Sequence, residues 1–145
     1  LRLPMGYPSS DDENVLLQRF RDAEPLESLD SVLSASELAG LQAACRRVYV
    51  EDSVRRYITN VCRATRGDDS LRLGASPRAT LALQQSSQAL AAIRGRDYVL
   101  PDDVKALAVP VLAHRVLLET GASVHGTNAV AVIERITTSV PVPVD

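Results

Sequence analysis

The sequence predicts an all-α protein, a compact helical bundle with at most one or two short extended segments. Apolar residues recur at helical spacing along most of the 145-residue chain, and serine or proline caps open several of these stretches. Aromatic residues make up only 3% of the chain against 46% hydrophobic residues, so the core must consist mainly of Leu, Val and Ala. A chain of this length is expected to form about one domain.

The N-terminal third predicts two helices, each opened by a serine capping box. The first runs over about residues 11–22, and the second begins at residues 34–37. A connector over residues 23–33 contains Pro25, and we expect its apolar residues to pin it to the core. The apolar side chains of these segments are Leu16, Leu17, Phe20, Leu26, Leu29, Val32, Leu38, Leu41, Cys45 and Val48.

The middle of the chain predicts the clearest helices. One has an apolar inner stripe with a period near 3.6 residues, and a polar loop over residues 66–75 follows it. The next begins with Ser76 as N-cap and Pro77 as first helical residue, and Gly95 ends it. Its small residues favour close approach of another helix. The two inner stripes are Val54, Tyr57, Ile58, Val61, Cys62 and Thr65, then Ala79, Ala82, Leu83, Ser86, Leu90 and Ile93.

The last third predicts one short extended segment at residues 98–100 and then a helix that starts at Pro101. Two aspartates in its first turn suit the helix dipole, and Pro110 interrupts or restarts this helix. The closing elements are a candidate short strand at 114–118, a helix over about 127–138, and two terminal prolines, Pro141 and Pro143.

The basic residues exclude one class of function. Fifteen of the 16 are arginine, and Lys105 is the only lysine. Because Lys105 follows Asp103 and Val104, the chain contains no GxxxxGK[ST] phosphate loop and is not a self-contained P-loop ATPase. A net charge of −2 also argues against nucleic-acid binding by the chain as a whole.

Catalytic and metal-binding patterns are absent from the sequence. His114 and His125 form no HExxH, and Cys45 and Cys62 form no CxxC. Two core thiols are the favoured interpretation of the cysteines, with a Cys–His nucleophile pair as the alternative. No apolar run approaches the roughly 18 residues of a membrane span, and no signal peptide is visible. We therefore expect a cytoplasmic protein without a metal site.

Two arginine features are candidate binding sites. Arg78 stands in the first turn of the helix capped by Ser76, where free N–H groups and the positive dipole end suit an anion. Its planar guanidinium is able to grip phosphate oxygens bidentately, and a local salt bridge or cap is the alternative. The second feature is a basic face on two consecutive helices, suited to phosphate or an acidic protein or simply solvated: Arg46, Arg47, Arg55, Arg56, Arg63 and Arg66.

Two runs in this order resemble the C-terminal lid domain of the MoxR-type AAA+ ATPases: GASPRA at Gly74–Ala79 and GRDYVLPDDVK at Gly95–Lys105. In that family the arginine of GASPRA is the sensor-2 arginine, which reaches from the lid to the γ-phosphate of ATP held by the core domain. The resemblance therefore implies this role for Arg78, and we expect Tyr7 and Pro8, at the domain crossing, to flank the adenine. The weaker matching pieces are Gly6–Pro8, Ala64–Arg66, His114–Arg115 and Val140–Pro143.

The resemblance also implies a domain organisation. Residues 1–9 would be the tail of a missing AAA+ core and the interdomain crossing, and residues 10–145 the helical lid domain. The phosphate loop and the other nucleotide-binding elements of the family lie in that core, so ATP and Mg²⁺ would be held there. We expect the parent protein to hydrolyse ATP and this chain alone to be inactive.

Family members form ring oligomers, often hexamers, and act as chaperone-like remodellers. They commonly work with von Willebrand factor A-domain proteins to mature other enzymes. The implied partners are therefore the chain's own core domain, neighbouring subunits of a ring and such an A-domain protein. A different hypothesis is a stand-alone helical interaction module that uses the Arg46–Arg66 face to bind an acidic protein or nucleic acid, and salt-dependent retention of DNA or RNA would favour it.

Overall fold

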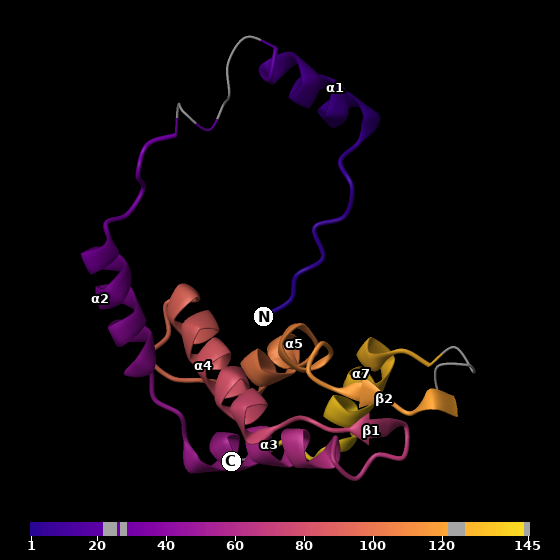
Figure 1. Cartoon of the computed structure of the whole chain (residues 1–145). Helices are drawn as coiled ribbons and strands as arrows, with labels where there is room; N and C mark the ends of the chain where they lie inside the picture. The colour runs from indigo at the N-terminus through magenta and orange to yellow at the C-terminus, as the bar shows by residue number, and fades with distance from the viewer. Residues whose placement is uncertain (22–25, 27–28, 122–126, 144–145) are drawn as a thin grey trace. The chain divides into compact units, whose positions relative to one another are not determined.

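The computed structural model of the chain describes residues 1–21, 26, 29–121 and 127–143. These residues contain six helices and one two-stranded sheet, which confirms the predicted all-α class (Figure 1). The elements are α1 (Ser10–Arg19), α2 (Ala35–Arg46), α3 (Asp52–Ala64), β1 (Leu71–Leu73), α4 (Pro77–Ile93), α5 (Pro101–Leu112), β2 (Leu117–Leu118) and α7 (Ala129–Ser139). The chain consists of two compact units. Residues Leu3–Leu41 form one unit, and Leu1–Arg2 together with Gln42–Asp145 form the other.

Local capping defines the helix starts in the unit of residues 3–41. The Ser9 hydroxyl accepts a hydrogen bond from the Asp12 N–H at 3.2 Å, and the Asp12 carboxylate accepts one from the Ser9 N–H at 3.3 Å. Ser34 and Glu37 form the same reciprocal pair, with distances of 3.2 and 2.8 Å. Each pair satisfies N–H groups that a helix start leaves without partners. The Ser34–Glu37 box is the predicted one, whereas the first box lies one residue before the predicted pattern of Ser10 and Glu13.

The apolar side chains of this unit are not covered within the unit itself. None of its described residues is buried, and Leu16, Leu17 and Phe20 are exposed at 51%, 69% and 57%. A helical period marks a face that would gain from burial, but so short a unit supplies no second surface to cover it. Leu26, Leu29, Val32, Leu38 and Leu41 are exposed as well, and the expected pinning of the connector to the core stays a prediction. From the same helix face as Leu38 and Leu41, Cys45 is half-buried and Val48 is buried.

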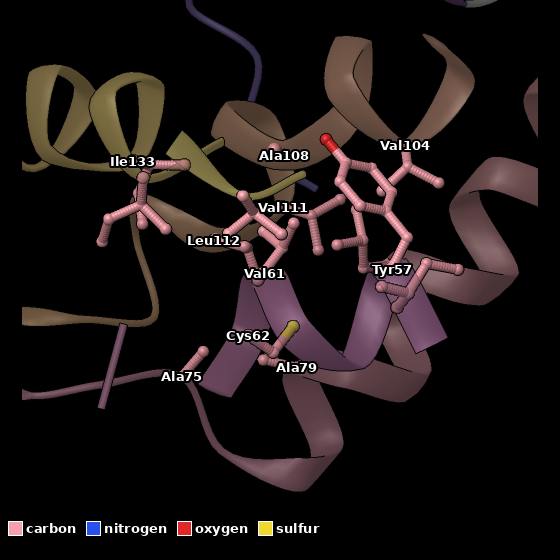
Figure 2. Close-up of a cluster of buried hydrophobic side chains, with 14 of the residues drawn as sticks. Tyr57, Val61, Cys62, Ala75, Ala79, Val104, Ala108, Val111, Leu112 and Ile133 are labelled. Atoms are coloured by element: carbon pink, nitrogen blue, oxygen red, sulfur yellow. The ribbon is translucent and has the colours of Figure 1, made fainter. Parts of the chain in front are cut away.

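The core lies in the other unit, between α3, α4, α5 and α7. Figure 2 shows inner side chains of α3, among them Val61, turned toward side chains of α5, among them Val111 and Leu112. All six residues of the predicted α3 stripe are buried, which confirms that prediction. The Tyr57 hydroxyl also donates to the Thr137 carbonyl of α7 at 3.4 Å, so the one large aromatic in the core has a polar partner.

The buried row of α4 differs in part from the predicted one. Ala79 and Leu83 are buried as expected, but the row continues through Ser87 and Ala91 at steps of four residues. Ile93 is 83% exposed. The predicted stripe included Leu90 and Ile93, whereas the buried row contains mainly small side chains, which favour close approach of neighbouring helices such as α5.

Three short features complete this unit. Pro110 lies inside α5, which continues to Leu112, so the predicted break is wrong. The proline removes one backbone hydrogen bond of the helix without ending it. β1 lies within the predicted polar loop and pairs antiparallel with β2, the last part of the predicted strand at 114–118. The extended segment at 98–100 forms a parallel bridge in which the Val99 N–H donates to the Tyr49 carbonyl at 3.0 Å. No helix in the described ranges is long and apolar enough to cross a membrane.

Replacing Leu112 by Ala is expected to lower the free energy of unfolding by about 3 kcal/mol, within the usual cost of truncating a buried leucine. Leu112 is fully buried at the centre of the core, so the change removes apolar contacts and leaves a cavity. Urea unfolding followed by circular dichroism measures the loss. Leu81→Ala is the matched control, since Leu81 is 60% exposed on α4, and equal losses in the two variants would contradict the observed packing.

Candidate functional site

Arg78 lies at the second residue of α4, at the helix end with free N–H groups. Ser76 is the N-cap, with φ −74° and ψ 164°, and its hydroxyl accepts from the Ala79 N–H at 3.4 Å. Pro77 takes the first helical position, as the sequence predicted. The Arg78 side chain is exposed, and within residues 29–121 and 127–143 it forms no hydrogen bond or ion pair. Its guanidinium is therefore available to a ligand on a well-defined helix start.

The segment before Ser76 is held by the end of α3. The Thr65 hydroxyl is fully buried, donates to the Cys62 carbonyl at 2.6 Å and accepts from the Ala75 N–H at 2.8 Å. The Arg66 Nε donates to the Ala75 carbonyl at 2.8 Å. Both polar backbone groups of Ala75 are thus bonded to two consecutive residues that follow α3. We call these contacts the Ala75 clamp.

Gly74 makes this close approach possible. A Cβ atom at position 74 would lie 2.6 Å from the Thr65 carbonyl oxygen and 2.7 Å from both the N and the Cα of Arg66. All three atoms belong to the backbone and have little freedom to move aside. The glycine of GASPRA is therefore required by packing, because any side chain there would push Ala75 away from Thr65 and Arg66.

The second run that carries the resemblance forms a buried ion cluster around Asp103. The Arg96 guanidinium binds the Asp103 carboxylate bidentately at 2.7 and 2.8 Å, and Arg94 adds a contact at 2.8 Å. The Leu100 N–H donates to the same carboxylate at 2.9 Å. Burial favours the neutral acid, but the hydrogen bonds from Arg96 and Leu100 outweigh it and hold the pKa of Asp103 below its ordinary value.

Gly95 completes the turn between α4 and α5. Its φ of +72° lies in the left-handed region, and the Arg96 N–H donates back to the Ala91 carbonyl at 2.9 Å. This is the glycine C-cap that the sequence predicted. The run from Gly95 to Lys105 is thus structural, because its charges tie the end of one helix to the start of the next.

Only part of the predicted basic face is free of local partners. Arg55 forms an ion pair with Asp52, and Arg66 belongs to the Ala75 clamp. The others are exposed: Arg46, Arg47, Arg56 and Arg63. Charge is also unevenly divided, since residues 3–41 carry eight acidic and two basic residues, net −6, and the rest carries fourteen basic and ten acidic residues, net +4. The positive charge therefore belongs to the unit that contains Arg78.

The remaining predicted site residues differ in where the structure places them. Tyr7 and Pro8 are exposed within the unit of residues 3–41, so their contact with adenine stays a prediction. Cys62 lies in the core, where burial raises the pKa of its thiol, and His114 is exposed. His125 and Pro25 lie outside the described residues. In the part of the chain that is described, no three His, Cys, Asp or Glu side chains form a group able to hold a metal.

Sequence reasoning missed the Ala75 clamp and the role of Asp103. Ala64–Arg66 and GASPRA were recognised separately as matching runs, but their contact joins residues ten positions apart. The one signal was a threonine on the inner stripe of α3, where a buried hydroxyl requires a hydrogen-bond partner. Asp103 was predicted as a capping or solvated acid at a helix start; it does cap α5 through the Leu100 N–H, but its full burial was not predicted.

Known proteins resemble the chain in sequence and in structure. Residues 63–136 match the AAA lid domain family. The chain is 38% identical to the uncharacterised protein YeaC of Bacillus subtilis over 99% of its own length and 45% of the relative. It is 32% identical to the chaperone MoxR1 of Mycobacterium tuberculosis over 98% of this chain and 40% of the relative. A crystal structure from Cytophaga hutchinsonii, assigned as an ATPase, superposes with a TM-score of 0.85 at 26% identity, over 97% of this chain and 45% of that one.

The fold and these matches define a lid domain of an AAA+ protein: the chain belongs to the AAA lid domain family. The relatives include MoxR proteins that match nearly its whole length, which confirms the resemblance to the MoxR-type lid. The chain spans less than half the length of YeaC and of MoxR1.

Replacing Asp103 by Ala is expected to lower the free energy of unfolding by about 3 kcal/mol near neutral pH, the lower end of the cost of breaking a buried pair. Arg96 would lose its partner, whereas Arg94 is half exposed and stays hydrated. Because the pKa of Asp103 is lower in the folded state, its stabilising contribution is present above about pH 4. The contribution is lost as the pH falls through the folded-state pKa.

Urea unfolding from pH 7 down to pH 2 measures this effect, and the difference between wild type and Asp103→Ala should shrink in acid. Asp102→Ala is the control, since the Asp102 side chain is 81% exposed. A stability difference that stays constant down to pH 2 would contradict an ionised, buried Asp103.

Proposed function

We propose that this chain is the sensor-2 lid of a MoxR-type AAA+ ATPase. It would couple ATP binding and hydrolysis by a core domain to chaperone-like remodelling or maturation of client proteins. The observation that carries the proposal is the Arg78 side chain, which is exposed on a capped helix start and has no partner among the described residues. A guanidinium in that place fits the oxygens of a phosphate group, because its planar fork binds them bidentately and the free N–H groups of the helix favour an anion.

In this mechanism Arg78 binds the γ-phosphate of ATP held by the core domain and so draws the lid toward the core. When hydrolysis removes the γ-phosphate, Arg78 loses this contact and the lid is released. ATP shifts the equilibrium between the two lid positions because Arg78 binds ATP in only one of them. Mg²⁺ would be held by core-domain residues that this chain does not contain. Tyr7 and Pro8 would contact the adenine at the crossing from core to lid.

The proposed setting is a ring oligomer in the cytoplasm, with neighbouring subunits of the same protein as partners. A hexamer and a von Willebrand factor A-domain partner belong to this proposal. It is supported by the AAA lid family match and by relatives that include a protein named as a chaperone.

Replacing Arg78 by Ala in the full-length protein is expected to lower ATP turnover at least about tenfold, because a preorganised charge that stabilises the transferred phosphate is lost. Arg78→Lys should give an intermediate rate, since it keeps the charge but not the bidentate fork. Steady-state ATPase assays measure both. Arg72→Ala is the matched control, an exposed arginine on β1. Unchanged turnover in the Arg78→Ala protein would overturn the sensor role.

This chain alone is expected to bind ATP no more tightly than millimolar. One charge-assisted hydrogen-bond contact contributes about 1.5–3 kcal/mol, whereas a millimolar dissociation constant requires about 4 kcal/mol. Isothermal titration calorimetry with ATP tests this expectation. Micromolar binding would show that the chain holds a nucleotide site beyond Arg78.

A further inference from the structure

We propose that Thr65 and Arg66 are positioning residues for Arg78, acting through the Ala75 clamp. The inference rests on the proposed function of Arg78 and adds a connection from α3 to that site. Neither residue is expected to touch the nucleotide. Their role is to fix the backbone from which Arg78 projects.

The geometry of the clamp supports this role. The Thr65 hydroxyl accepts from the Ala75 N–H at 2.8 Å, and the Arg66 Nε donates to the Ala75 carbonyl at 2.8 Å. With both backbone groups bonded, the two peptide planes that flank Ala75 are fixed relative to the end of α3. Ser76 follows directly, and its φ, ψ and hydroxyl define the first turn of α4. The clamp therefore determines where α4 begins and in which direction its first turn points.

Arg78 depends on this backbone because its side chain has no other support. In the described ranges no hydrogen bond or ion pair holds the guanidinium, so only the start of α4 determines its position. The Thr65 hydroxyl is anchored in turn by the Cys62 carbonyl at 2.6 Å, and Cys62 is fully buried in the core. Ala75 and Ala79 belong to the same buried cluster as Cys62 and are labelled with it in Figure 2. The clamp thus joins the Arg78 helix start to the rigid interior of the lid.

The Thr65 hydroxyl and the Arg66 guanidinium can be removed separately from the full-length protein. Thr65→Val keeps the branched shape and removes the hydroxyl, whereas Thr65→Ser keeps the hydroxyl. Arg66→Met keeps an unbranched chain and removes the Nε donor. Since Arg66 is exposed, this variant tests the clamp even if Thr65→Val does not fold. Arg63→Met is the matched control, because Arg63 is exposed on α3 and takes no part in the clamp.

Thr65→Val and Arg66→Met are each expected to lower kcat for ATP hydrolysis about tenfold, below the roughly 10²-fold that a 1 Å misplacement can cost. Thr65→Ser and Arg63→Met should stay within about twofold of wild type, because both leave the clamp intact. Hydrogen–deuterium exchange of the segment 74–79 provides a readout independent of activity. Exchange there should be faster in Thr65→Val and Arg66→Met than in the two controls.

A double-mutant cycle with Arg78→Ala separates positioning from general damage to the fold. If Thr65 and Arg66 act through Arg78, their substitutions lower turnover in the wild-type background and have no further effect on the Arg78→Ala protein. Equal losses in both backgrounds, or no loss in either clamp variant, would overturn the positioning role while the sensor role of Arg78 stands. Wild-type turnover in Arg78→Ala itself would overturn the proposed function and this inference together.

Discussion

The buried carboxylate of Asp103 is the constraint on which the α4–α5 pair depends. Its negative charge in the core requires compensation, and Arg96, Arg94 and the Leu100 N–H supply it from the turn between the helices. The backbone of that turn must therefore bring both arginines back over the first turn of α5. Gly95 permits this reversal by taking a positive φ. The small buried side chains of α4 then let α5 lie close beside it, so the polar turn and the apolar contact reinforce each other.

α4 is consequently fixed by polar contacts at both ends and by apolar packing between them. The Asp103 cluster holds its C-terminal end, and the Ala75 clamp holds its N-terminal end against α3. Ala79 and Leu83 bury the face between these anchors. A helix held in this way has little freedom to shift along its axis or to rotate. Its first turn is thus a rigid support for Arg78, whose side chain forms no hydrogen bond or ion pair with the residues that the structure describes.

The sequence predicted those features that depend on neighbouring residues and missed those that depend on distant ones. Ser76 as N-cap and Gly95 as C-cap were predicted, since each follows from local hydrogen bonding. The α3 stripe was also right, because one face of that helix is strongly apolar. Leu16, Leu17 and Phe20 follow a similar period, but a period identifies a face without identifying its partner. The contact between Thr65 and Ala75 and the burial of Asp103 arise only when helices pack, and no local pattern encodes them.

If Arg78 acts as proposed, one arginine would influence the position of the lid although it binds ATP only weakly. A coupling of about 1–3 kcal/mol changes an equilibrium about 5- to 150-fold, which is the range of a single charge-assisted contact. Such a contact would be too weak to retain ATP on the lid alone, yet it would be strong enough to change which lid position predominates when the proposed core holds ATP. The coupling would reach the rest of the lid only if the backbone at Arg78 is rigid. A flexible helix start would move with the phosphate and leave the rest of the lid in place. Rigid anchoring of α4 is therefore the physical requirement that the proposed sensor places on this fold, and the Ala75 clamp is the part of the structure that meets it.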